Sequence, residues 1–83
     1  MKILYFAWLR ERIGAAQESE APPGTVSTVG ELLDWLAELS PGHASALENR
    51  QVVRVAVNQE FADLDALVAT GDEIGLFPPM TGG

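Results

Sequence analysis

Near its N-terminus the chain carries a strongly apolar run, Lys-Ile-Leu-Tyr-Phe-Ala-Trp-Leu, at residues 2 to 9. The run is short and rich in β-favouring side chains, which predicts a strand. Because side chains alternate across a strand, one face would carry Ile3, Tyr5, Ala7 and Leu9, and the other Leu4, Phe6 and Trp8. Both faces are therefore apolar. Such a strand either lies inside a two-sided core or shows one side to a partner.

An amphipathic helix is predicted to begin at Thr28. Thr28 and Glu31 have the spacing of a capping box, in which each side chain binds the backbone amide of the other residue. Apolar residues then recur at helical spacing and form one stripe, with Trp35 at its margin. The stripe comprises Val29, Leu32, Leu33, Leu36 and Ala37. Proline at position 41 is expected to stop this helix, and a second short helical segment is expected over residues 44 to 49.

Further segments are predicted to complete a sheet. The Arg-Glu-Arg-Ile-Gly segment at residues 10 to 14 is typical of a helical turn that ends at a glycine. Residues 16 to 24 are too polar for a central strand, so an edge strand returning as a hairpin is expected there. The remaining predicted strands are a regular one at residues 51 to 57, a short edge strand within residues 61 to 67, and a last strand at residues 73 to 77.

These elements predict an α+β fold, in which a mixed sheet of about five strands clasps one main helix. The first and last strands are the most apolar, so they are expected side by side at the centre of the sheet. They would run parallel, because the helix between them acts as a crossover. This arrangement brings Phe6 and Phe77 together on the sheet face away from the helix, where Phe61 and Trp8 would extend an apolar patch.

Charge and composition argue against several kinds of function. A net charge of −7 would repel phosphate backbones, so no nucleic acid partner is expected. The sequence has no cysteine, which excludes disulfides, thiolate nucleophiles and cysteine-ligated metals. The single histidine, His43, follows Ser-Pro-Gly and is expected in a solvated loop, so we expect no bound metal. No stretch approaches the roughly 20 apolar residues of a membrane span, and a cytoplasmic location is expected.

The last seven residues, Phe-Pro-Pro-Met-Thr-Gly-Gly, differ in character from the rest of the chain. Two prolines fix φ and remove backbone donors, so the final strand must stop there. The closing glycines have no side chain to pack, and four residues can extend about 13 Å at roughly 3.3 Å each. We therefore predict a folded domain over residues 1 to 79 and a flexible tail over residues 80 to 83.

The order of elements, the Leu-Arg-Glu-Arg-Ile-Gly segment at residues 9 to 14 and the ending from Gly71 to Gly83 resemble a known family. They are similar to the small, sulfur-carrying subunit of molybdopterin synthase, the MoaD type of the ubiquitin-like family. The resemblance spans the whole chain, and its Gly-Asp-Glu, Phe-Pro-Pro and Gly-Gly elements are specific in combination. It implies a β-grasp fold and a role in molybdenum cofactor biosynthesis.

The resemblance also implies a chemistry and a set of partners. An E1-like adenylyltransferase would use ATP to adenylate the carboxylate of Gly83, and a sulfur donor would convert it to a thiocarboxylate. The sulfur would then pass to a cyclic pterin precursor in the large subunit, within a heterotetramer. The chain itself would be a non-catalytic subunit with no bound cofactor. The tail residues Met80, Thr81 and Gly82 would deliver the terminus.

Partner-binding roles are implied for four residues, Phe6, Arg10, Phe61 and Phe77. For Arg10, a solvated charge that pairs with Glu11 or Glu18 is the alternative. Three other functions also stay open at this point. They are sulfur carriage for thiamine or cysteine synthesis, ubiquitin-like modification of lysines, and a plain interaction module with an idle tail.

Overall fold

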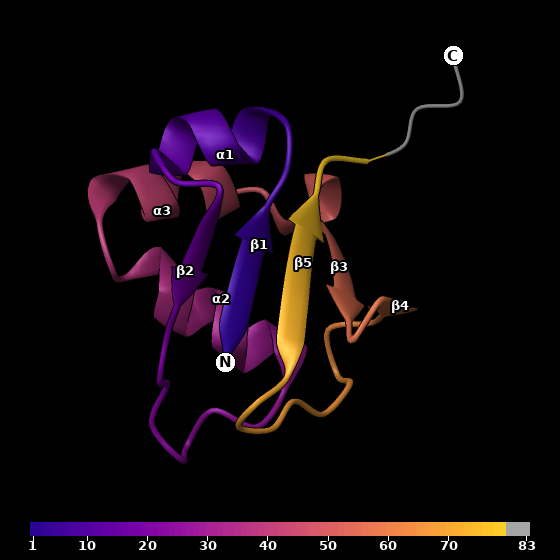
Figure 1. Cartoon of the computed structure of the whole chain (residues 1–83). Helices are drawn as coiled ribbons and strands as arrows, with labels where there is room; N and C mark the ends of the chain where they lie inside the picture. Colours follow the sequence, from indigo (N-terminus) through magenta and orange to yellow (C-terminus); the bar gives the residue numbers. More distant parts are fainter. Residues whose placement is uncertain (80–83) are drawn as a thin grey trace.

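The computed structural model describes residues 1 to 79, which contain five strands, three α-helices and one 3-10 helix (Figure 1). In Figure 1, α2 crosses behind the strands and α1 lies over their upper end. The elements are β1 (Lys2–Tyr5), α1 (Trp8–Ile13), β2 (Gln17–Ser19), α2 (Val29–Ala37), α3 (Pro41–Leu47), the 3-10 helix η1 (Arg50–Val52), β3 (Arg54–Val57), β4 (Glu60–Ala62) and β5 (Glu73–Phe77). The predicted α+β architecture, a mixed sheet clasping one main helix, is confirmed.

The sheet has the strand order β2-β1-β5-β3-β4, with β5 in the middle. β1 and β5 pair in parallel, with Tyr5 opposite Leu76, whereas the other pairs are antiparallel. The predicted central, parallel pairing of the first and last strands is therefore confirmed. The polar strand β2 and the short strand β4 form the two edges, as their composition predicts.

The core lies between α2 and the inner face of the sheet. The predicted capping box is present at the start of α2. The Thr28 hydroxyl accepts from the Glu31 amide at 3.2 Å, and the Glu31 carboxylate accepts from the Thr28 amide at 3.1 Å. Four residues of the predicted stripe are fully buried, and Ile74 and Leu76 of β5 face them from the sheet as predicted. The four are Val29, Leu32, Leu33 and Leu36.

The first strand is shorter than its apolar run predicts. β1 ends at Tyr5, and Ala7 has a φ of 55°, so the extended backbone is broken before Leu9. Trp8 begins α1 instead, and its ring packs against the core beneath the guanidinium of Arg12, 4.9 Å from the ring centroid. Trp8 therefore does not extend the patch around Phe6, and that prediction is wrong. Periodicity alone cannot reveal a single residue with positive φ.

The environment of His43 also differs from the prediction. Ser40 caps α3 and Pro41 occupies its first turn, so the helix begins three residues earlier than expected. His43 is consequently helical and only 5% exposed, rather than solvated in a loop. Its ring is satisfied by two side chains, because Ser40 and Glu18 lie within hydrogen-bonding distance of its nitrogens. The predicted strand over residues 51 to 57 is likewise shortened, since its start forms η1.

None of the helices in residues 1 to 79 has the length and apolar character needed to cross a bilayer.

Candidate functional site

Three phenylalanines meet on the outer face of the sheet, the face opposite α2, and we call them the aromatic cluster. Phe6 follows β1, Phe61 lies in β4 and Phe77 ends β5. The rings of Phe6 and Phe77 are stacked, with centroids 4.4 Å apart and planes 3° apart. Phe61 meets Phe77 edge to face, at 6.0 Å and 60°. The predicted proximity of Phe6 and Phe77 is thus confirmed, with Phe61 beside them.

The aromatic cluster is incompletely covered by the rest of the chain. Phe61 is 71% exposed and Phe6 is 39% exposed. Full burial of a phenylalanine side chain is worth about 1.5 to 3 kcal/mol, so the folded domain gains little from Phe61 in this position. Contiguous exposed apolar surface of this kind marks an interaction site. The structure therefore makes the outer face of the sheet a candidate surface for a protein partner.

A small hollow lies within this face, with a volume of about 320 Å³. It is lined by the aromatic cluster, by small or aliphatic residues of the three central strands and by two polar residues. The lining residues are Leu4, Phe6, Ala56, Gln59, Phe61, Glu73, Gly75 and Phe77. Gly75 and Ala56 were not among the predicted site residues, although alternation in the last strand places Gly75 on the same face as Phe77.

The tail leaves the domain from the same strand that carries Phe77. β5 ends at Phe77, and Pro78 and Pro79 follow it. The predicted reacting residue Gly83 and the tail residues Met80, Thr81 and Gly82 lie outside the described residues. Their predicted roles are therefore untested by the structure. The structure does place Pro78 and Pro79, where the tail starts, at the end of the central strand β5 and beside the aromatic cluster.

The turn into β5 is built by the predicted Gly-Asp-Glu element. Gly71 has a φ of 92°, which favours glycine. The Asp72 carboxylate accepts from the Asn58 amide group at 3.0 Å and from the backbone amide of Ala69 at 2.8 Å. These hydrogen bonds, Asn58 first, lower the pKa of Asp72. The Asn58 side chain also accepts from the Glu73 amide at 3.0 Å, so the start of β5 is tied to the end of β3.

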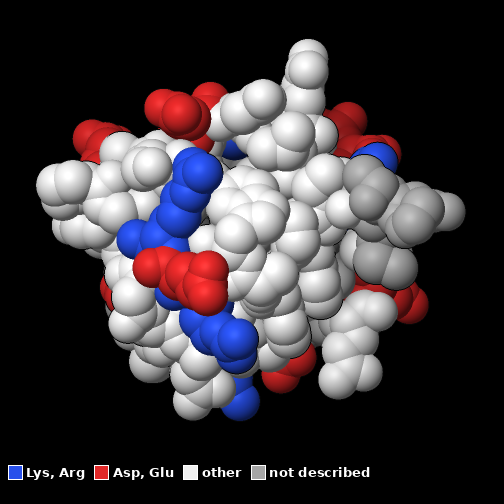
Figure 2. All heavy atoms as spheres, turned by 90° about the horizontal axis from the view of Figure 1, so that it is seen from above, with Lys and Arg blue, Asp and Glu red and all other residues white. Residues whose placement is uncertain are grey.

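Arg10, the remaining residue with a predicted partner role, lies in α1 and is exposed. Figure 2 shows basic side chains, with an acidic one between them, at the end of the molecule where α1 lies; this helix contains Arg10, Glu11 and Arg12. Within residues 1 to 79, the Arg10 guanidinium forms no ion pair with Glu11 or Glu18. The structure therefore leaves Arg10 at the surface, on a different element from the aromatic cluster.

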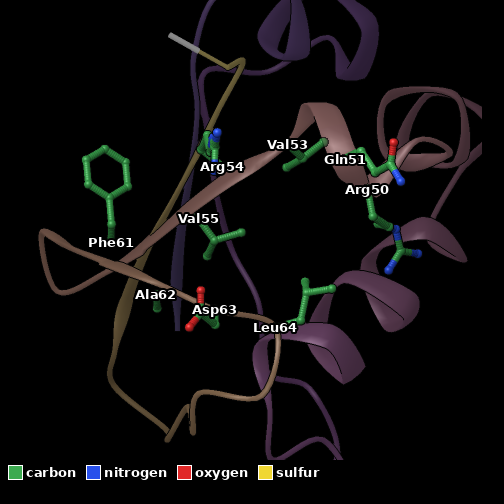
Figure 3. Close-up of a pocket in the computed structure, with 9 residues that line it drawn as sticks. All are labelled: Arg50, Gln51, Val53, Arg54, Val55, Phe61, Ala62, Asp63 and Leu64. Atoms are coloured by element: carbon green, nitrogen blue, oxygen red, sulfur yellow. The ribbon is translucent and has the colours of Figure 1, made fainter.

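A second, larger pocket of about 540 Å³ lies between η1, β3, β4 and the segment after β4 (Figure 3). Arg50 at its end is already engaged, because its guanidinium binds the Leu47 carbonyl at 2.7 Å and the Asp34 carboxylate at 2.9 Å. In Figure 3 the Phe61 ring lies at the opposite end from Arg50 and Leu64. Across the described part of the chain, no group of acidic and histidine side chains is arranged to hold a metal ion.

Comparison with known proteins gives a full-length match. A sequence model of the ThiS family matches residues 3–83. The molybdopterin synthase sulfur carrier subunit of Escherichia coli (strain K12) is 37% identical over 83 residues, which cover 100% of this chain and 99% of that protein. The subunit of the same name from Haemophilus influenzae is 40% identical over 84 residues, which cover 100% of this chain and 99% of that protein.

A similar fold is found among solved structures. The crystal structure of SAMP1 from Haloferax volcanii superposes with a TM-score of 0.76 at 36% identity, covering 100% of this chain and 98% of that one. The β-grasp fold implied by the sequence is thereby confirmed.

Proposed function

The chain belongs to the ThiS family, and we propose from that membership that it is the sulfur carrier subunit of a molybdopterin synthase in molybdenum cofactor biosynthesis. The observation that carries this proposal is the end-to-end match to relatives of that name, which extends through the terminal Gly-Gly. Sulfur carriage for another pathway and lysine modification are not favoured by these relatives.

The reacting group in this proposal is the α-carboxylate of Gly83. A carboxylate is a poor electrophile, so it must first be activated. Its oxygen attacks the α-phosphorus of ATP in an E1-like activating enzyme, which forms an acyl-adenylate and releases pyrophosphate. Hydrosulfide supplied by a sulfur donor then attacks the acyl carbon, AMP leaves, and a thiocarboxylate remains. ATP is a substrate of the activating enzyme and is not held by this chain.

Sulfur transfer would take place in the large subunit. The thiocarboxylate sulfur attacks a carbon of the cyclic pterin precursor and displaces an oxygen substituent of that carbon. Water then cleaves the acyl–sulfur bond, which leaves sulfur on the pterin and a carboxylate on Gly83. This is covalent group carriage through a protein terminus. The chain contributes the reacting terminus and its delivery, whereas the catalytic side chains belong to its partners. Assembly with the large subunit into a heterotetramer is part of this proposal.

The outer face of the sheet supports such a role because it combines a docking surface with the start of the tail. Phe77 belongs to the aromatic cluster and is followed by Pro78 and Pro79, which direct the chain away from the last strand. The four residues beyond Pro79 can span about 13 Å, which is sufficient to enter a pocket of a docked partner. Terminal glycines fit a channel too narrow for a Cβ. Arg10 would contribute a basic contact at the rim.

Intact mass spectrometry tests the proposal directly. The purified chain is incubated with the activating enzyme, ATP and a sulfide donor, and the expected product has one oxygen replaced by sulfur. Gly83→Ala should abolish this product, whereas Gly24→Ala, at a glycine with open space around it, should not. An unchanged mass under these conditions would contradict the proposal. Gly-Gly remnants on lysines of other proteins would instead indicate conjugation.

A further inference from the structure

The middle of the central strand is occupied by a glycine. Gly75 pairs with Leu4 of β1 on one side and with Ala56 of β3 on the other, so it is enclosed by backbone on both edges. Glycine weakens the interior of a strand, and where it occurs there it often marks a close approach of another group. The group that approaches Gly75 is the aromatic pair of Phe6 and Phe77.

The geometry of this approach is tight. A Cβ added at Gly75 would lie 2.9 Å from Cε1 and 3.1 Å from Cζ of Phe77, and 3.6 Å from Cε2 of Phe6. The first distance is shorter than van der Waals contact permits. The Phe77 ring therefore lies over the backbone of its own strand, in space that any other residue at position 75 would fill. The ring of Phe6 then stacks on it at 4.4 Å.

The same glycine lines the hollow. Gly75 and Ala56, which have small or no side chains, line it together with Phe6, Phe61 and Phe77. Six of the eight lining residues are apolar or glycine, and the polar ones are Gln59 and Glu73. The lining of the hollow is thus mainly apolar and suits an apolar side chain.

The position of the tail indicates what covers this hollow. Six residues, 78 to 83, follow Phe77 in the sequence, and they can extend about 20 Å at roughly 3.3 Å each. A protein that receives the carboxylate of Gly83 must therefore lie close to the end of β5. The hollow runs along β5 from Glu73 to Phe77 and so reaches that end, and the strongly exposed Phe61 also lines it.

We propose that Gly75 is a positioning residue for docking, which lets the Phe77 ring lie on the sheet and so shapes the hollow to receive one apolar side chain of the large subunit. This inference rests on the proposed function, because it takes the large subunit as the partner. Gly75 acts through Phe77 and has no chemical role of its own. Its substitution should therefore alter binding without altering the chemistry at Gly83.

Gly75→Ala is the central test. The atoms that an alanine methyl would meet belong to the end of the Phe77 side chain, so the ring can move and the chain should still fold. Calorimetric titration with the purified large subunit should show an affinity at least about tenfold weaker than that of the unsubstituted chain. The ring-current shifts of the residue 75 backbone protons in NMR spectra should also change. Gly24→Ala serves as the control and should bind normally.

A double-mutant cycle with Phe77→Ala separates this role from a general structural one. Once the ring is absent, Gly75→Ala should cause little further loss of affinity. An equal loss in both backgrounds, or unchanged binding by Gly75→Ala despite a displaced ring, would overturn the inference while leaving the proposed function intact. If the unsubstituted chain did not bind the large subunit at all, both would be overturned.

Discussion

The imidazole Nε2 of His43, in α3, lies 2.8 Å from a carboxylate oxygen of Glu18, in the edge strand β2. The same oxygen accepts the Tyr5 hydroxyl at 2.7 Å, and His43 Nδ1 lies 2.7 Å from the Ser40 hydroxyl. The His43 ring also meets the Tyr5 ring edge to face at 5.9 Å. This network joins β1, β2 and the start of α3. Since β2 has only three residues, the network is a major tether of that edge.

The stability of the domain should fall on acidification through Glu18. Burial by itself raises the pKa of Glu18, but the hydrogen bonds from His43 and Tyr5 and the charge of His43 outweigh it and lower the pKa below 4.5. The folded state therefore binds this proton less readily than the unfolded state. The stabilisation by the ionised Glu18 carboxylate is fully present above the pKa of Glu18 in the unfolded chain. It is lost as pH falls through the lower pKa of Glu18 in the folded chain.

Urea denaturation across pH tests this role, with Glu18→Gln as the comparison. At about pH 7 the variant should be less stable by roughly 1 to 2 kcal/mol, because hydrogen bonds to an ionised acceptor are the stronger ones. The two proteins should converge as the pH falls through the lowered pKa of Glu18 in the folded chain, since its carboxylate is then protonated. A difference that stayed constant with pH would show that the charge of Glu18 is unimportant.

Ser40→Ala should destabilise the domain by about 1 to 2 kcal/mol, because it removes the cap of α3. The Ser40 hydroxyl accepts from the His43 amide at 3.2 Å and is also the partner of His43 Nδ1. Ser45→Ala, on the exposed side of the same helix, should change the free energy of unfolding by less than about 0.5 kcal/mol. Thermal and urea unfolding of the two variants give the comparison, and equal stabilities would contradict the capping role.

Gly42→Ala should destabilise the packing of α3 on α1. A Cβ at Gly42 would lie 2.6 Å from the carbonyl oxygen of Arg12, and a backbone atom cannot move aside as the end of a side chain can. We expect a loss of about 1 to 3 kcal/mol, as for other overpacked sites. Gly24→Ala provides the matched control, because nothing lies within 4 Å of the added atom. A Gly42→Ala variant as stable as that control would show that the helices separate without penalty.

Elements with a repeated pattern could be predicted from the sequence. The stripe of α2 recurs at helical spacing and the capping box at Thr28 fixes its start, so both were identified. The parallel pairing of β1 with β5 followed from their apolar character and the intervening helix. That pairing also predicted that Phe6 and Phe77 lie together, as their stacked rings do.

Features that depend on single residues or distant partners could not be predicted. The buried His43 ring lies within hydrogen-bonding distance of Glu18, which is 25 positions away on another element. The local Ser-Pro-Gly sequence therefore does not indicate that His43 is buried. The early end of β1 depends on the positive φ of Ala7, which composition does not reveal. The importance of Gly75 depends on the side-chain conformation of Phe77, which only the folded structure specifies.

Phe61→Ala should weaken binding of the large subunit far more than it lowers stability. Phe61 is 71% exposed, so the folded domain depends on it little and unfolding should change by less than about 0.5 kcal/mol. Its ring is nevertheless one side of the hollow and meets Phe77 edge to face, so a docked partner would cover it. Truncation of a central aromatic anchor typically costs more than about 1 kcal/mol of binding energy.

Leu67→Ala is the matched control for this prediction, because Leu67 is 76% exposed and does not line the hollow. We expect Phe61→Ala to raise the dissociation constant at least about tenfold and Leu67→Ala to leave it unchanged, as measured by calorimetric titration with the large subunit. Equal affinities for the two variants would show that exposure alone does not identify the docking face. A large fall in melting temperature for Phe61→Ala would instead place Phe61 in the core, where a binding assay could not isolate its role.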